Sequence, residues 1–133
     1  MAKGEEQPAA EAPDAAQPTL LKGDLFLLDW SPGRGSEQSG IRPALIVQNN
    51  ALNSNPRYPN TIVVAVSKHG KPVPTHVEIP QDAENGLWEP LSYAKCEQLF
   101  TVDKARLQRK VGKITGEQLA AVSRALKRVL SLA

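Results

Sequence analysis

The chain has 133 residues, of which 41% are hydrophobic and 23% charged, and its formal net charge is +2. These values are typical of one globular domain and exclude a chain that is disordered throughout. The longest apolar run covers residues 62–66, far short of the ~20 residues of a membrane-spanning helix. The single cysteine, Cys96, excludes an internal disulfide and a multi-cysteine metal site. With no secretory signal visible at the start, we expect a cytoplasmic, metal-free protein.

The first 19 residues differ in composition from the rest. They hold six alanines and three prolines and cannot bury enough apolar area to offset their ordering entropy. We therefore expect a disordered acidic tail at 1–19 and one folded domain at 20–133. One lysine against four acidic side chains gives the tail a charge of −3, so the remainder carries +5. Residues 104–133 hold eight basic side chains against Glu117 alone. This basic end either attracts a polyanion or is the solvated face of a helix, and charge alone favours the second.

The first half of the domain reads as short strands joined by long loops. Alternating or β-branched apolar residues bounded by Gly, Pro, Asn and Ser predict strands at 25–30, 42–49, 61–67 and 75–79. The loops between them are 31–41, 50–60 with one helical turn, and 68–74. Pro43 has no N–H to donate, so it belongs at the start of a strand or on a sheet edge.

The second half adds a strand at 91–101 with a kink near residues 94–95, a helical turn at 103–107 and a last short strand at 110–114. A helix then begins after Thr115, which forms a capping-box pattern with Gln118. Leucines and valines recur at helical spacing through 119–130, with basic residues opposite. No helix of ten or more residues is expected between the strands, which argues against parallel winding. The pattern predicts a β-rich α+β fold, a small barrel-like sheet closed by a C-terminal amphipathic helix.

Few side chains suggest chemistry. Arg42 follows a Gly/Ser-rich loop, where its planar fork of donors suits a phosphate; a surface arginine that begins a strand explains it equally well. Ser67 ends a strand and is followed by Lys68 and His69. Its hydroxyl suits a hydrogen bond to a phosphate oxygen or the cap of a simple turn. Cys96 is expected to be a half-buried small residue. His76 alternates with apolar neighbours and is expected on the outer face of its strand.

The order of several segments is specific. They are Lys22-Gly-Asp24, Ser31-Pro32, GSEQSGIRP at 35–43, ALIVQN at 44–49, TIVVAVS at 61–67, PTHVEI at 74–79, EQLFTVDK at 97–104 and Arg106-Leu107. With these segments the chain resembles the MazF/PemK family of toxins from type II toxin–antitoxin systems, over about residues 21–132. The resemblance implies an SH3-like barrel, also called the plasmid-maintenance toxin or CcdB-like fold, that acts as a homodimer. It also implies a sequence-specific mRNA interferase that cleaves single-stranded RNA without metal or other cofactor.

The resemblance assigns the chemistry to two positions. Arg42 matches the family's Arg-Pro motif, and Ser67 stands where the family usually has Thr. Glu37 of the loop is a further catalytic candidate, and His69 is another for proton transfer. RNA supplies its own nucleophile, the 2′-hydroxyl, so the products are a 2′,3′-cyclic phosphate or 3′-phosphate and a 5′-hydroxyl.

Base recognition is expected from the loops, which the resemblance places along a groove across the dimer. The candidate RNA-binding residues are Arg34, Gln38, Asn53, Arg57, Lys68 and Gln98, with Trp30 and Trp88 as possible stacking partners. Each of the six, taken singly, is more simply a solvated loop residue. The resemblance also implies an acidic, partly disordered MazE-like antitoxin as partner. Two alternatives remain open: a gyrase-poison toxin of the same fold, which needs no Arg42/Ser67 pair, and a non-catalytic RNA-binding barrel.

Overall fold

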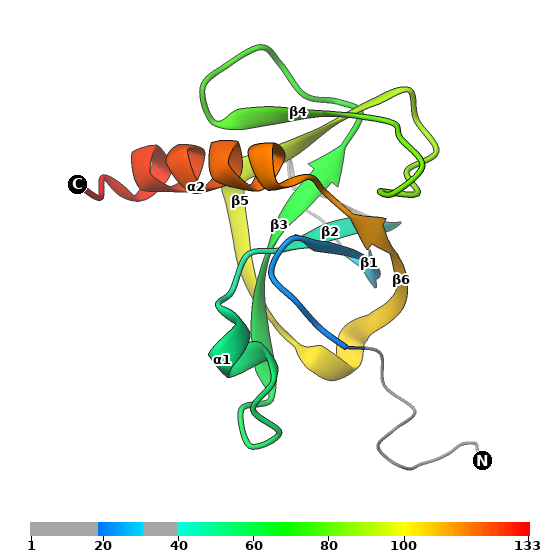
Figure 1. Cartoon of the computed structure of the whole chain (residues 1–133), viewed down its shortest axis with the longest axis vertical. Helices are drawn as coiled ribbons and strands as arrows, with labels where there is room; N and C mark the ends of the chain where they lie inside the picture. The colour runs from blue at the N-terminus through cyan, green and yellow to red at the C-terminus, as the bar shows by residue number, and fades with distance from the viewer. Residues whose placement is uncertain (1–18, 31–39) are drawn as a thin grey trace.

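The computed structural model describes residues 19–30 and 40–133 (Figure 1). The strands are β1 (Asp24–Asp29), β2 (Ile41–Ile46), β3 (Asn60–Ser67), β4 (His76–Pro80), β5 (Leu91–Asp103) and β6 (Leu107–Lys113). The helices are α1 (Asn50–Asn53), the 3-10 turn η2 (Lys104–Arg106) and α2 (Gly116–Leu130). The strands form one antiparallel sheet in the order β4-β5-β3-β2-β1-β6. The expected β-rich α+β class is confirmed, with each predicted strand present and its ends displaced by up to three residues. The expected tail lies almost wholly outside the described residues.

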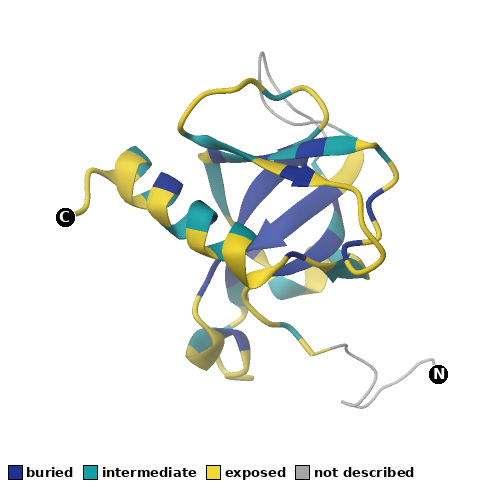
Figure 2. Ribbon diagram, turned by 45° about the horizontal axis from the view of Figure 1, so that its top comes forward, coloured by how far each residue is buried: buried dark blue, intermediate teal, exposed yellow. Residues whose placement is uncertain are grey.

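The apolar run at 62–66 is explained by the position of β3 inside the sheet, where both of its faces are covered. Val64 and Val66 belong to a core that also contains Val122 and Ala125 of α2. Val63 points the other way, into a second core with Phe26 and other residues of the opposite face. Side chains of a strand alternate between faces, so a strand buried on both sides is apolar throughout. Figure 2 shows these buried strands at the centre, with exposed loops around them.

The kink predicted in the fifth strand is an irregularity in the pairing of β5 with β3. Val64 pairs with Leu99, but the next residue, Ala65, pairs with Lys95. Three residues of β5, 96–98, therefore have no counterpart on β3 at this point, and an insertion of this kind bends a strand. The bend separates a half of β5 that pairs with β4 from a half that continues toward η2.

Helix α2 begins with the predicted capping box. The Thr115 hydroxyl accepts from the Gln118 backbone N–H at 3.1 Å, and the Gln118 side chain accepts from the Thr115 N–H at 2.9 Å. The helix packs on β4 and β5, and its exposed face carries Arg124, Lys127 and Arg128 (Figures 1 and 2). Of the helices in the described part of the chain, none is long and apolar enough to cross a membrane.

The segment between β4 and β5, residues 81–90, lies against β6 at the other edge of the sheet. The Lys113 N–H donates to the Glu84 carbonyl at 3.1 Å. A Cβ at Gly112 would lie 2.2 Å from that same carbonyl oxygen, so only glycine permits this approach. Gly86 has φ +65° and would place a Cβ 2.3 Å from the Val111 oxygen. The loop that follows one edge strand, β4, thus contacts the other edge strand, β6.

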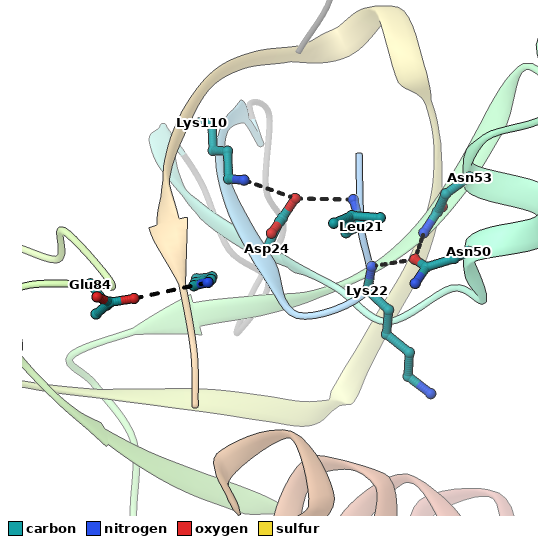
Figure 3. Close-up of polar contacts among 8 residues, drawn as sticks. Leu21, Lys22, Asp24, Asn50, Asn53, Glu84 and Lys110 are labelled. Carbon is teal, nitrogen blue, oxygen red and sulfur yellow. Dashed lines mark hydrogen bonds and ion pairs between the residues drawn. The ribbon is translucent and has the colours of Figure 1, made fainter. Parts of the chain in front are cut away.

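Lysine and asparagine side chains attach α1 to the sheet. Lys104, directly after β5, donates from Nζ to the carbonyls of Leu52 at 2.9 Å and Asn55 at 3.1 Å, which lie in and just beyond α1. Burial lowers the pKa of the Lys104 ammonium. Asn50 Oδ1 accepts from the Lys22 N–H at 2.7 Å, which attaches the other side of α1 to the chain before β1 (Figure 3).

Asp24 is a buried carboxylate at the start of β1 with two partners (Figure 3). Its side chain is 3% exposed, its Oδ2 accepts from the Leu21 N–H at 3.0 Å, and it lies 3.3 Å from Lys110 Nζ on β6. A buried charge needs such partners, since its desolvation is otherwise uncompensated. The aspartate of the Lys22-Gly-Asp24 segment therefore joins the edge strand β6 to the turn before β1.

We expect Asp24→Ala to lower the free energy of unfolding by about 2 kcal/mol, because the Leu21 N–H and the Lys110 ammonium both lose a charged acceptor. Asp24→Asn keeps an acceptor for the N–H and should lose less. Urea denaturation followed by tryptophan fluorescence measures both variants. Equal losses of stability in the two variants would contradict a role for the hydrogen bond from the Leu21 N–H to the side chain at position 24.

Candidate functional site

Arg42 and Ser67 are brought opposite each other by the pairing of β2 with β3. The ladder runs from Ile46 opposite Val63 to Ala44 opposite Ala65. Two more residues in the same antiparallel register place Arg42 opposite Ser67, where directly opposed side chains lie on the same face about 5 Å apart at Cβ. Pro43 lies between them, and because it has no N–H to donate, it suits the point where the ladder with β3 ends. It was expected at the start of a strand or on a sheet edge, but it is the third residue of the central strand β2 and pairs with Leu27 of β1.

Both residues line a pocket with a cavity volume of about 190 Å³. The residues that β2, β3 and the chain after β3 contribute to it are Arg42, Pro43, Val66, Ser67, Lys68 and His69. The Ser67 hydroxyl oxygen accepts from the His69 backbone N–H at 3.0 Å, which sets the turn that follows β3. The Arg42 carbonyl accepts from the Trp30 indole N–H at 3.3 Å. The two predicted catalytic residues and two neighbours from the loop after β3 therefore meet in one place.

The opposite wall comes from the segment before β5, which we did not predict to meet Arg42. It contributes Leu87, Trp88 and Glu89, and Ser92 follows from β5 itself. Glu89 Oε2 lies 3.8 Å from Lys68 Nζ, so the loops before and after β4 meet across the pocket. Trp88 was considered only as a stacking partner, and Glu89 was missed. The only signal for them was an exposed-looking Trp-Glu-Pro sequence between two strands.

Asn85 organises this wall from beneath and is itself fully buried. Its Oδ1 accepts from the Leu87 N–H at 3.0 Å, and its Nδ2 donates to the Pro80 carbonyl at 2.9 Å. Asp82 Oδ1 in turn accepts from the Asn85 N–H at 2.7 Å. Side-chain acceptors of this kind replace strand hydrogen bonds in a turn. The segment is thus held in one conformation up to the residue before Trp88.

The loop after β3 is held by His76, which alternates with the core-packed Val77 and Ile79 as expected but is covered by its neighbours. Its side chain is 7% exposed, its Nε2 lies 2.7 Å from Glu97 Oε2, and its Nδ1 accepts from the Lys71 N–H at 3.0 Å. Because Nδ1 accepts, the ring proton is on Nε2 and is donated to Glu97. Gly70 lies so close to Tyr93 that a Cβ would come within 2.0 Å of its ring. These contacts fix the chain that carries Lys68 and His69.

The electrostatics of two β5 side chains follow from their surroundings. Burial acts to raise the pKa of the Glu97 carboxyl, but hydrogen bonds from His76, from its own backbone N–H and from Thr75 outweigh it and leave the pKa lowered. Burial, assisted by the charge of Glu97, raises the pKa of the Cys96 thiol to about 12. Cys96 is fully buried, not half-buried as expected, and its thiol stays protonated at neutral pH.

Of the other predicted RNA contacts, those within the described residues do not gather at this pocket. Arg34, Glu37 and Gln38 lie outside the described residues. Arg57 is exposed near the start of β3, and eight residues of strand separate that end from Ser67, about 23 Å. Gln98 lies in the irregular part of β5. Trp30 packs edge-on against Phe100, with ring centroids 5.2 Å apart.

Asn53 is buried, and the expectation that it contacts RNA needs correction. Its Oδ1 accepts from Thr61 at 2.8 Å and from Gln48 at 3.0 Å. Its Nδ2 donates to the Gln48 carbonyl at 2.9 Å and to Asn50 at 3.3 Å (Figure 3). Both ends of the amide are engaged in attaching α1 to β3, so no part of it is available to a base. Among the residues that the structure describes, no three His, Cys, Asp or Glu side chains cluster as a metal site.

Known proteins resemble this chain in sequence and in fold. Residues 21–130 match the family described as PemK-like, MazF-like toxin of type II toxin-antitoxin system. The endoribonuclease MazF of Staphylococcus epidermidis is 37% identical over 116 residues, which cover 85% of this chain and 92% of that protein. The endoribonuclease EndoA of Bacillus subtilis (strain 168) is 39% identical over 116 residues, covering 85% and 96%. A crystal structure of MazE–MazF from Deinococcus radiodurans matches with a TM-score of 0.67 at 23% identity, covering 88% of this chain and 100% of the matched chain.

The lowered pKa of Glu97 predicts how acid destabilises this site. The unfolded carboxyl, with a pKa near ~4.3, takes up its proton first as pH falls, so the stabilisation is complete above that value and disappears as pH falls through the lower folded pKa. Glu97→Gln has no carboxylate to titrate. Its free energy of unfolding in urea should fall less steeply between about pH 5 and pH 3 than that of the wild type.

The matched control is Glu78→Gln, which removes an exposed carboxylate from the neighbouring strand β4. It should follow the wild-type slope more closely than Glu97→Gln does. Identical slopes in the wild type and Glu97→Gln would mean that the contacts of Glu97 do not stabilise its charged form.

Proposed function

The chain belongs to the PemK-like, MazF-like toxins of type II toxin–antitoxin systems and is a MazF-type endoribonuclease; from this premise we propose that it cleaves single-stranded RNA at the pocket shared by Arg42, Ser67 and His69. The observation that carries the proposal is that an arginine of β2 and a hydroxyl from the end of β3 line one pocket. The 2′-hydroxyl of the substrate supplies the nucleophile, so cleavage needs no metal ion and DNA is not a substrate.

Arg42 stabilises the charge that develops on the phosphate. In the cleavage step the 2′-oxygen forms a bond to phosphorus, the bond from phosphorus to the 5′-oxygen breaks, and a 2′,3′-cyclic phosphate and a 5′-hydroxyl result. The non-bridging oxygens gain charge in the transition state, and a guanidinium offers them paired, permanently charged donors. Lys68, on the neighbouring wall, adds a second cation that attracts the RNA backbone.

Ser67 and His69 complete the site. The Ser67 hydroxyl already accepts from the His69 N–H, which leaves its own hydrogen free to be donated to a phosphate oxygen. Neither Arg42 nor Ser67 is a base at neutral pH, whereas histidine is the side-chain type best suited to proton transfer there. We assign to His69 the proton of the 2′-hydroxyl or of the leaving 5′-oxygen, with Glu37 as the other candidate.

The surroundings of the site follow from the same family membership. A MazE-like antitoxin with an acidic, partly disordered segment is the expected partner, consistent with the MazE–MazF structure from Deinococcus radiodurans and with the charge of +5 that the sequence places outside residues 1–19. A homodimer with the RNA groove across it completes the assembly. Arg34, Gln38, Arg57 and Gln98 remain candidates for contacts along that groove. The protein acts in the cytoplasm, where its RNA substrate is.

The sheet takes the form of an SH3-like barrel. The bend in β5 and the contact of the 81–90 segment with β6 support closure of the sheet on itself. The domain covers residues 20–133, and the acidic segment 1–19 lies outside it.

Arg42→Ala should reduce cleavage of a long defined RNA by at least ~100-fold, because it removes the main stabilisation of the transition-state charge. The assay is run in EDTA, with primer extension to map the cuts. Arg109→Ala, which removes an exposed cation from β6, is the matched control and should cut at the wild-type positions. Arg42→Ala protein that melts like the wild type and cleaves at an unchanged rate would remove Arg42 from the mechanism.

Ser67→Ala should lower the cleavage rate by at least ~10-fold through loss of the hydroxyl donor, while Ser67→Thr, which restores the family's usual residue, should retain it or increase it. Threonine keeps the donor and restricts its rotation. Single-turnover cleavage rates distinguish the two variants. Similar losses in both would contradict the donor role of the Ser67 hydroxyl, because threonine retains that donor.

A further inference from the structure

We propose that Trp88 and Glu89 form a site for one unpaired base next to the scissile phosphate, and that this site selects guanine over uracil. The proposal rests on the function proposed above and names the residues that decide which base is accepted. It begins from the pocket, whose one wall carries Arg42 and Ser67 and whose other wall carries Trp88 and Glu89. A phosphate held on the first wall places the adjoining nucleoside against the second.

Trp88 has the exposure and the support that a stacking platform needs. It is 51% exposed, whereas Trp30 packs on Phe100 and donates its indole N–H to a backbone carbonyl. A large aromatic ring left in water at a pocket is free to gain from stacking against a base. Stacking alone tolerates any base, so Trp88 accounts for binding and not for choice.

The backbone around Trp88 is held on both sides. Leu87, directly before it, is buried; its N–H donates to Asn85 Oδ1 at 3.0 Å and its carbonyl accepts from Gln81 Nε2 at 2.8 Å. Pro90, two residues after it, accepts from the Gln81 N–H at 3.0 Å. Trp88 and Glu89 are therefore presented by a short segment whose two ends are fixed. A platform ordered before binding does not lose conformational entropy when the base arrives.

The size of the pocket limits what it holds. Its cavity volume of about 190 Å³ is smaller than the ~300–1,000 Å³ of pockets that enclose drug-sized ligands. A pocket of this size suits a single small planar group beside the phosphate and not a longer stretch of RNA. The choice is therefore made at a single position of the RNA sequence.

Glu89 accounts for the preference of this site for guanine over uracil. A carboxylate only accepts hydrogen bonds, so it favours a base edge that carries N–H donors. The pairing edge of guanine presents two adjacent donors, which a carboxylate binds together, whereas that of uracil presents one donor between two carbonyl oxygens that repel it. The 3.8 Å separation from Lys68 Nζ is long for a hydrogen bond, which leaves the Glu89 oxygens available to a base.

The test measures the cut sites of purified protein on a randomised single-stranded RNA library by sequencing the new 5′ ends. The wild type should prefer guanine over uracil at one position next to the cut. Glu89→Gln, whose amide both donates and accepts, should reduce that preference by about tenfold at this position alone. Trp88→Ala should raise KM by about tenfold with the fold intact, and Trp88→Phe should restore most of the loss.

Two comparison variants distinguish base recognition by Glu89 from a general effect of removing a charge. Glu84→Gln removes an exposed carboxylate of the same segment, which lies 4.0 Å from Lys113 Nζ, and it should leave the cut-site preferences unchanged. Lys68→Ala should weaken cutting at all sites equally if Lys68 contacts phosphate. If Lys68→Ala instead reproduces the Glu89→Gln profile, the ion pair and not base reading sets the preference, and the proposal is overturned.

The remaining outcomes distinguish failure of the proposed function from failure of the base site. A wild type that leaves RNA uncut refutes the proposed function itself. A wild type that cuts, with the same base preferences in Glu89→Gln and no KM change in Trp88→Ala, refutes only the base site. A wild-type preference for uracil at the position that Glu89→Gln alters would refute guanine selection.

Discussion

The register between β2 and β3 is the constraint on which the rest of the molecule depends. The paired residues of both strands are buried on both faces, so their polarity does not oppose a shift of the register by one residue. The sizes of their side chains oppose it. Ala44 opposite Ala65 leaves room for the large residues beside them. Two residues further on, the same register places Arg42 opposite Ser67, beyond the point where Pro43 ends the ladder. A slip would carry one of them to the opposite face of the sheet and separate the guanidinium from the hydroxyl.

The two loops that complete the pocket are ordered by side chains that take no part in the proposed chemistry. Asn85 holds the segment with Trp88, and His76, donating to Glu97, holds the segment with His69. The side chain of each is buried and makes more than one hydrogen bond, so its loss removes several contacts at once. The site is thus built from strand ends whose positions follow from the sheet and from loops whose positions follow from buried polar residues.

Local signals allowed most of the elements to be predicted from sequence. The capping box at Thr115 and the β-branched run before Ser67 each depend on neighbours within a few residues, and both predictions are confirmed. The burial of Asn53 and the place of His76 depend on partners from other strands, as does the wall that Glu89 adds to the pocket. From the sequence alone, an asparagine in a loop and a histidine in an alternating strand are expected to be solvated. In the folded chain Asn53 accepts from Thr61, and His76 contacts Glu97. Sequence periodicity carries no information about such partners, which explains why these contacts were not predicted.

Some of the segments that carry the family resemblance stabilise the fold, and others line the candidate site. Asp24 and Lys104 belong to two of those segments and stabilise the fold. Asp24 contacts Lys110 of β6, and Lys104 donates to a carbonyl of α1. Arg42 and Ser67 belong to two others and face the pocket. Trp88 and Glu89 lie between the quoted segments, in a stretch of chain that the resemblance does not describe, yet they form the wall opposite the arginine. A family that keeps its phosphate chemistry on one wall is free to change its base preference on the other. The choice of RNA sequence is therefore best sought in the loop that carries Trp88 and Glu89, because substitutions there leave the strand register and the reacting groups in place.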